Sequence, residues 1–204
     1  MYSLLLATLL SLPIAPLNPI QQDTLDQAAL HFTAGIASPN GIVQAGPEIS
    51  SKLEMLIIHP LVLRAGADYR FAPVRAKLYP DGDFHQGIFS IEAIYYRGTN
   101  HLTGYLGLGA VYAIGDFNPT TGTADSLARF YGIDDVGIGG DLGYRITMGL
   151  RYHETLSLEV GITELKPKFV YKRQYSPTET SQFTEQFRNS SFRVSIGYVW
   201  SVFR

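Results

Sequence analysis

Charged residues recur at alternate positions within stretches of the chain that are otherwise apolar, small or hydroxylated. The acids are Glu48, Glu54, Asp68, Glu92 and Glu159, and the bases are Lys52, Arg64, Arg70, Arg145, Arg151 and Arg193. Such a set could conduct protons or ions, or Glu92 or Glu159 could act as a general base. Alternatively it is a salt-bridge core, because interleaved opposite charges satisfy each other while an isolated buried charge is costly. The near balance of acids and bases favours this structural interpretation.

Histidine is the other residue type that could carry catalysis. The chain has five, His31, His59, His85, His101 and His153. A Ser/His/acid relay needs a histidine beside a serine, with an acid to orient it. His59, His101 and His153 lie in or beside short turns, and no serine nucleophile is recognisably placed with His85. We therefore predict no catalytic residues.

Paired aspartates suggest oxygen ligands for a divalent cation. Asp81 and Asp83 form one pair and Asp134 and Asp135 the other, but neither matches a calcium loop, and a turn explains Asp81-Gly82. Phosphate-loop, dinucleotide and zinc motifs are absent from the sequence. The absence of cysteine removes thiolate metal sites, thiol nucleophiles, disulfides and a lipoprotein anchor. We predict no metal and no cofactor.

The composition limits the partners. With 16 basic and 18 acidic residues the net charge is −2, which gives no general attraction to nucleic acid. The 204 residues suit one domain. Aromatic residues make up 12% of the chain and glycines number 20, while no apolar run reaches the length of a transmembrane helix.

Alternation with period two dominates the chain and predicts strands. It is clearest from Leu61 to Phe71, from Leu142 to Tyr152 and from Phe192 to Val202. Extended along the chain, the pattern predicts eight strands: 29–38, 46–57, 60–71, 86–97, 102–114, 136–152, 155–170 and 190–202. Most reach the ~9–11 residues that a tilted strand needs to cross a membrane.

The predicted connections alternate in length. Short turns fall at Ile58-His59, Gly98 to His101 and His153-Glu154, whereas the longer connections are 39–45, 72–85, 115–135 and 171–189. Short turns at one end and long loops at the other are typical of an up-and-down outer-membrane barrel. Both termini should then lie at the end with the short turns.

The polar face of these strands should point inward. The apolar face carries no charge, glycines gather on the polar face where a narrow barrel needs small residues, and aromatics lie near strand ends on the apolar face. A soluble lipocalin-like barrel would have the opposite orientation. The predicted fold is therefore all-β, an eight-stranded antiparallel up-and-down transmembrane β-barrel with a lumen filled by side chains.

The last strand supports a resemblance to a known family. Phe192, Val194, Ile196, Tyr198 and Trp200 share one face, and Phe203 is penultimate. With the strand count and loop alternation, residues 29–204 resemble the OmpA/OmpX-type small outer-membrane barrels, including the opacity-like proteins. The resemblance implies the outer membrane of a Gram-negative-type bacterium, with outer-membrane lipid and the barrel assembly machinery as partners. That machinery reads a terminal aromatic; here Arg204 follows Phe203, so Phe203 or Trp200 would serve.

The N-terminal residues predict export. Ser3 to Ala15 is an apolar run of the length of a signal core, although no Lys or Arg precedes it. We expect a signal peptide and polar leader over 1–25 and the barrel over 26–204.

The leading functional hypothesis is a non-enzymatic, monomeric barrel in the structural or surface-interaction class. Its lumen is plugged by Lys52, Glu54, Arg64, Asp68, Glu92, Arg145, Arg151, Glu159 and Arg193. Its long loops would bind an extracellular ligand, because a rigid scaffold holds them. The alternatives are a lipid A-modifying outer-membrane enzyme and a soluble ligand-binding barrel.

Overall fold

A computed structural model of the chain describes residues 28–40, 43–75, 80–99, 101–176, 179–187 and 189–203. The predicted signal peptide and leader lie outside these residues. Ten strands form one antiparallel sheet: β1 (Ala28–Asn40), β2 (Gly46–Ile58), β3 (Leu61–Val74), β4 (Gly82–Gly98), β5 (Leu102–Pro119), β6 (Asp135–Tyr152), β7 (Leu156–Glu164), β8 (Lys168–Ser176), β9 (Glu179–Gln186) and β10 (Ser190–Phe203).

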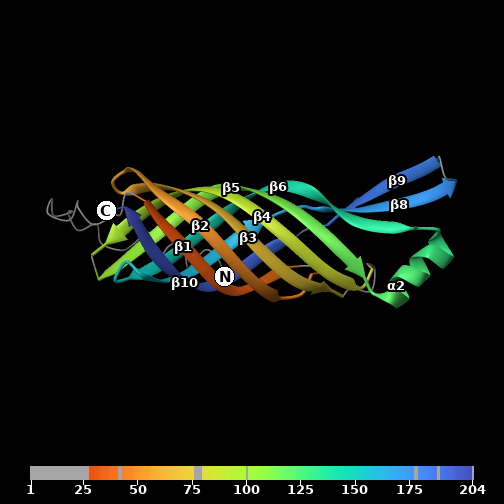
Figure 1. Cartoon of the computed structure of the whole chain (residues 1–204), viewed down its shortest axis with the longest axis horizontal. Coiled ribbons are helices and arrows are strands. Elements are labelled where there is room, and N and C mark those ends of the chain that lie inside the picture. The colour runs from red at the N-terminus through yellow and green to blue at the C-terminus, as the bar shows by residue number, and fades with distance from the viewer. Residues whose placement is uncertain are drawn as a thin grey trace.

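Eight of these strands, β1 to β7 and β10, close into a barrel. Each of β1 to β7 pairs with its sequence neighbour, and β10 completes the ring by pairing with β7 and β1 (Figure 1). The predicted all-β, eight-stranded antiparallel barrel is thus confirmed. No helix in the described part of the chain is long and apolar enough to cross a membrane.

The two ends of the barrel differ in the way that the sequence predicted. The turns His59–Pro60 and His153–Thr155 and the connection between β4 and β5 lie at one end, together with the start of β1 and the end of β10, where Ala28 pairs with Phe203. The other end extends well beyond the barrel as the β8–β9 hairpin and a short helix (Figure 1).

The predicted seventh strand, 155–170, and the loop predicted over 171–189 were wrong in detail. β7 ends at Glu164, and the chain continues as β8, which turns back as β9. The register of β7 against β10 continues unbroken into that of β8 against β9, bridged by backbone bonds from Asn189 to Leu165 and from Phe187 to Pro167. The two strand pairs therefore form one long two-stranded arm. The sequence did not predict the outer half of this arm, because residues 171–189 are mostly polar and were assigned to a loop.

A β-bulge in β6 changes which residues face inward. Ala113 pairs with Asp141 but Gly115 pairs with Ile138, so β6 carries one extra residue at Gly139–Gly140. Below the bulge the odd-numbered residues, such as Arg145, point into the lumen; above it Val136 is buried instead. A bulge shifts the phase of alternation and bends the strand. Here it turns Val136 into the apolar cluster at this end of the barrel.

The connection between β5 and β6 is partly helical. α2 (Thr121–Ser126) runs directly into η2 (Leu127–Tyr131), which ends at Gly132 in the left-handed conformation with a φ of 62°. Leu127 packs against the apolar cluster at this end of the barrel, whereas Phe130 and Tyr131 are exposed. The polar sequence of 115–135 had predicted only a long connection.

Candidate functional site

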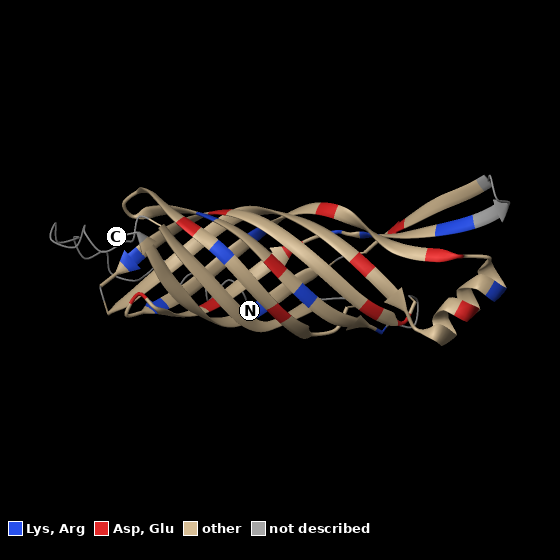
Figure 2. Ribbon diagram, in the orientation of Figure 1, with Lys and Arg blue, Asp and Glu red and all other residues tan. Residues whose placement is uncertain are grey.

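All eleven charged residues predicted to face inward are buried in the lumen. Glu48, Lys52 and Glu54 come from β2, Arg64, Asp68 and Arg70 from β3, Glu92 from β4, Arg145 and Arg151 from β6, Glu159 from β7 and Arg193 from β10. Figure 2 shows basic and acidic residues interleaved along the strands of the barrel. The alternation of each strand positions them, because successive side chains leave opposite faces of the sheet.

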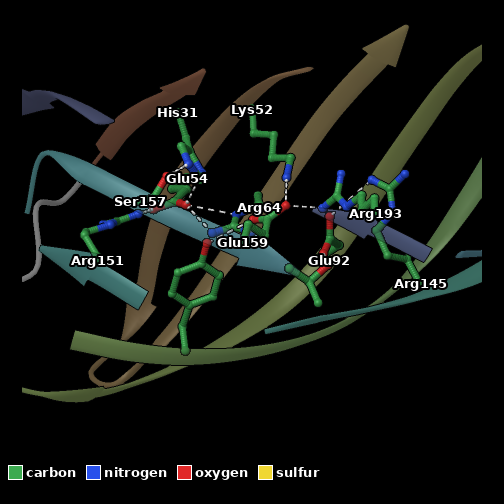
Figure 3. Close-up of polar contacts among 12 residues, drawn as sticks. His31, Lys52, Glu54, Arg64, Glu92, Arg145, Arg151, Ser157, Glu159 and Arg193 are labelled. Atoms are coloured by element: carbon green, nitrogen blue, oxygen red, sulfur yellow. Dashed lines mark hydrogen bonds and ion pairs between the residues drawn. The ribbon is translucent and has the colours of Figure 1, made fainter. Parts of the chain in front are cut away.

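Glu159 is the centre of this charge network. Its carboxylate accepts bonds from Nζ of Lys52 at 2.5 Å and from Nη1 of Arg64 at 2.9 Å, and it pairs with Nη2 of Arg193 (Figure 3). Tyr105 donates its hydroxyl to the same carboxylate at 3.0 Å. A wholly buried carboxylate is tolerated only where cations and donors satisfy its oxygens. Here three strands besides its own supply cations, so the network spans the lumen.

Glu54 forms a second centre nearer the short turns. Arg64 donates to it through Nε at 2.9 Å and Nη2 at 2.6 Å, so the guanidinium of Arg64 bridges Glu54 and Glu159. Arg151 reaches the other oxygen of Glu54 at 2.6 Å, and the Tyr96 hydroxyl donates to it at 2.9 Å. Because a planar guanidinium can serve two carboxylates at once, Arg64 links the two centres rigidly.

The network continues toward the opposite end. Asp68 lies 2.6 Å from Nη2 of Arg145, while Glu92 accepts a bond from Thr147 at 2.7 Å. Glu48 pairs with Arg70 at 2.8 Å and with Arg193 at 3.2 Å. Arg145 contacts Asp68 and Glu92, and Arg193 contacts Asp68 and Glu159 as well as Glu48. Arg64, in the first centre, likewise contacts two carboxylates. The charges form one connected set and not isolated pairs.

Glycines make room for these long side chains. A Cβ on Gly66 would approach the Lys52 side chain to 2.8 Å, and one on Gly161 would approach Nε of Arg193 to 2.8 Å. Contacts this short do not occur between real side chains, so both positions need glycine to let the cations pass. The glycines on the inner face are therefore part of the packing of the network.

An apolar cluster lies at the end of the barrel opposite the short turns. Its buried members are Val43, Ala72, Val74, Phe84, Phe117, Ile133, Val136, Phe169, Tyr171 and Phe187. Phe169 packs face to face with Phe187 at 4.8 Å and edge to face with Phe117 at 5.3 Å between ring centroids. We call this set the apolar cap. Its residues come from β3 to β6, from the inner face of the long arm and from the adjoining loops.

Sequence reasoning missed three lumen residues. His31 lies 2.6 Å from the Ser157 hydroxyl through Nε2 and 3.5 Å from Glu54 through Nδ1, and Tyr96 and Tyr105 supply hydroxyl donors. The tyrosines share the phase of Glu92 and Gly107, which could have revealed them. Ser157, His31 and Glu54 have the residue types of a catalytic relay, but all are buried inside the network. A Cβ on Gly197 would come within 2.7 Å of the Ser157 oxygen, so little room is left beside it.

Within the part of the chain that the structure describes, the histidines outside the lumen form no relay with an acid. His85 points outward near the extended end of the barrel and shares a 2.6 Å hydrogen bond with the Tyr69 hydroxyl. Within the described residues no carboxylate is hydrogen-bonded to His85. His101 and His153 contact each other edge to face at the short-turn end, 4.8 Å apart. No group of three or more potential metal ligands occurs in the described part of the chain.

The outer face of the barrel is an uncharged apolar belt. Between Asp83 and Arg97 no outward residue of β4 is Asp, Glu, Lys or Arg, and the strands around it show Ile36, Leu106 and Ile196 more than half exposed. These two charges are about 46 Å apart along the strand, or about 35 Å along the axis at a tilt of roughly 40°. That height covers an apolar band of ~25 Å and its interfaces.

Comparisons with solved structures show the fold. The chain is similar to the outer membrane protein OprG from Pseudomonas aeruginosa at 13% identity, with a TM-score of 0.62 over 87% of this chain and 98% of that chain. Neisserial surface protein A is 14% identical, with a TM-score of 0.54 over 86% and 97%. The outer membrane protein AlkL is 12% identical, with a TM-score of 0.51 over 93% and 98%. This is the fold of a small outer-membrane β-barrel. No protein-family model and no curated protein sequence matches the chain.

The apolar belt and this fold together show that the protein lies in an outer membrane, where the belt contacts lipid. In such barrels the short turns face the periplasm and the long connections face the exterior. By this rule we expect the arm, α2 and η2 to lie on the extracellular side. The outward residues of the last strand, Phe192, Val194, Ile196, Tyr198 and Trp200, are exposed on the belt. The side chain of Phe203 and residue Arg204 lie outside what the structure describes.

Proposed function

We propose that the protein is a non-enzymatic outer-membrane barrel with a sealed lumen, which serves the cell through the surface that its extracellular end presents. The observation that carries this proposal is the filling of the lumen. The network around Glu159 occupies the middle, and the apolar cap lies above it. An ion crossing the barrel would have to break several buried ion pairs and then enter an apolar layer, and both steps are costly.

The extracellular end supports the second half of the proposal. The arm projects beyond the lipid belt, and η2 is held against it because Arg173 donates to the carbonyl of Tyr131 and Asp134 donates its backbone N–H to Lys172. Exposed aromatics occur here, with Phe130 at 71% and Tyr131 at 60% of full exposure. Aromatic side chains on a rigid scaffold favour binding to other molecules.

Measurement of conductance tests the sealed lumen. The protein, folded in planar lipid bilayers, should give no stepwise current at voltages where a general porin included as a control conducts freely. Entry of small sugars into proteoliposomes, followed by swelling, should equal that of empty vesicles. A steady open-channel current from the purified barrel would overturn the proposal.

The enzymatic alternative lacks support from the site. A lipid-modifying enzyme would need its relay on the lipid-facing side, where His85 is bonded to Tyr69 instead of to an acid. The constellation of His31, Ser157 and Glu54 lies inside the charge network, where an acyl chain has no approach. We therefore propose that neither arrangement is catalytic.

Two further proposals concern export and assembly, and the oligomeric state. We propose that residues 1–25 act as the export signal and leader, and that the barrel assembly machinery recognises the β10 strand through Trp200 or Phe203. We also propose that the barrel functions as a monomer, since the eight strands close without contribution from a second chain. Replacement of Trp200 and Phe203 by alanine, singly and together, followed by the heat-modifiable gel shift of membranes, tests the assembly role.

A further inference from the structure

The outer half of the arm leaves one strand edge open. β10 pairs with β1 as far as Ser190 opposite Asn40, where β1 ends and Val43 turns inward to bridge Val74. β9 continues β10 beyond that point and pairs with β8 on one side. On its other side no strand of the described chain pairs with it. A row of backbone N–H and C=O groups along β9 therefore faces outward.

This edge lacks most of the usual protection. Natural sheets block exposed edges with charged side chains, above all lysine, and with proline, bulges or very short strands. β9 has the sequence ETSQFTEQ, with no Lys, Pro or Gly, and its register against β8 is unbroken from Thr180 to Gln186. Its side chains from Gln182 to Gln186 are exposed to solvent. Such an edge is a template for the addition of another strand.

The edge is also held in place before any partner arrives. Phe183 of β9 stacks on Tyr171 of β8, with ring centroids 4.7 Å apart and planes 14° from parallel. Tyr171 belongs to the apolar cap, and β8 is paired on its other side with the start of β6. A strand that is already ordered pays little conformational entropy on binding. The arm is thus a rigid platform and not a flexible loop.

The side chains on β9 define the chemistry of the occupant. Phe183 is 49% exposed and lies on the inner face of the arm, and Glu185 is exposed on the same face two residues away. No Lys or Arg belongs to β9. The cation of β8 on this face, Arg173, donates to the carbonyl of Tyr131. An added strand would therefore place an apolar residue beside Phe183 and a basic residue beside Glu185.

We propose that β9 docks an extended, basic segment of a partner protein, which joins the sheet as an additional strand. This inference rests on the proposed surface function and names the chemistry of the partner. A second copy of the chain fits less well. Two barrels in one membrane are related by rotation about the membrane normal, so both β9 strands run in the same direction. That relationship excludes the antiparallel pairing that two open edges would most readily form.

The test uses the folded full-length barrel in lipid nanodiscs and short labelled peptides. The probe is a blocked octapeptide of alternating Thr and Val in which one Phe and one Lys stand two positions apart. Two further versions carry N-methyl groups on alternate residues, in opposite phase, so that each removes the donors of one edge only. Fluorescence anisotropy should show binding of the parent peptide and of one methylated version, with at least a tenfold loss for the other.

Charge exchange identifies the surface. Glu185→Lys should weaken binding of the Lys peptide about fivefold and should strengthen binding of the matching Glu peptide, as expected for exposed charges. Asp125→Lys is the matched control, because it makes the same change of charge in α2, which Figure 1 shows apart from β9. It should leave both affinities unchanged. The heat-modifiable gel shift verifies that each variant is folded.

Several results would overturn this inference. They are equal binding of both methylated peptides, no binding of the parent peptide at any concentration at which it is soluble, or the same response from Asp125→Lys as from Glu185→Lys. Cross-linking of Thr184→Cys barrels to one another within one membrane would show that a second copy is the occupant. None of these results bears on conductance, so failure of the docking edge and failure of the sealed lumen are separately measurable.

Discussion

Lys52 on β2 and Glu159 on β7 are hydrogen-bonded at 2.5 Å across the lumen, although their strands are not neighbours in the sheet. The Lys52 side chain therefore crosses the interior to a strand that lies three places away around the barrel. Gly66, beside the Lys52 side chain, leaves the space for it. Ion pairs between strands that are not neighbours therefore fill this part of the lumen.

Replacement of Glu159 by Gln should strongly destabilise the barrel. Lys52, Arg64 and Arg193 would lose a shared carboxylate and remain buried, which costs roughly 3–5 kcal/mol in the free energy of unfolding. Urea unfolding in lipid vesicles measures the change. Glu185→Gln, the same chemical change at an exposed position, is the control and should shift the midpoint little. Equal midpoints for the two variants would contradict the network.

The Arg145 and Asp68 pair should show compensation. Arg145→Met leaves the Asp68 carboxylate without its nearest cation, 2.6 Å away, and should cost about 3–5 kcal/mol. Adding Asp68→Asn removes the stranded charge, so the double variant should recover a large part of that loss. A double-variant cost equal to the sum of the two single costs would show that the pair is not coupled.

The belt predicts an asymmetric response at adjacent residues of β6. Ile146 is only partly buried and points toward lipid, whereas Thr147 is fully buried and donates to Glu92. Ile146→Arg should lower the free energy of unfolding from vesicles by ~2–4 kcal/mol, because a guanidinium is drawn to mid-bilayer depth. Thr147→Ser keeps the hydroxyl and should change little. Insertion of Ile146→Arg as readily as the parent would contradict the lipid-facing assignment.

Proteolysis of intact cells tests the orientation of the barrel in the membrane. Trypsin added to intact cells should cut at Arg129, which lies exposed in η2 on the extracellular side. Arg97, beside a short turn, should be cut only after the outer membrane is opened. Mass spectrometry of the fragments identifies the sites, and Arg129→Gln should remove the cleavage. Fragments ending at Arg97 from intact cells would reverse the topology.

Much of the fold was determined by the sequence alone. A charge such as Glu92 or Arg145 cannot face lipid, so the period-two alternation fixes which side of each strand is the lumen. Short turns such as His153–Thr155 against long polar connections fix the order of the ends. These features are local: each depends on a strand and its immediate neighbours in the chain. They were enough to predict the barrel and the membership of the charge network.

Only the tertiary structure decided which charges meet and how β6, β8 and β9 are arranged beyond the barrel. Arg64 bridges Glu54 and Glu159 because closure of the sheet brings β3 opposite β7, a relationship that no periodicity contains. The extra residue at Gly139–Gly140 reverses the alternation of β6, so Val136 turns inward. The polar segment containing Phe183 becomes a strand because it extends the register of β10 and stacks on Tyr171. Pairing with a distant partner, and not local propensity, stabilises it.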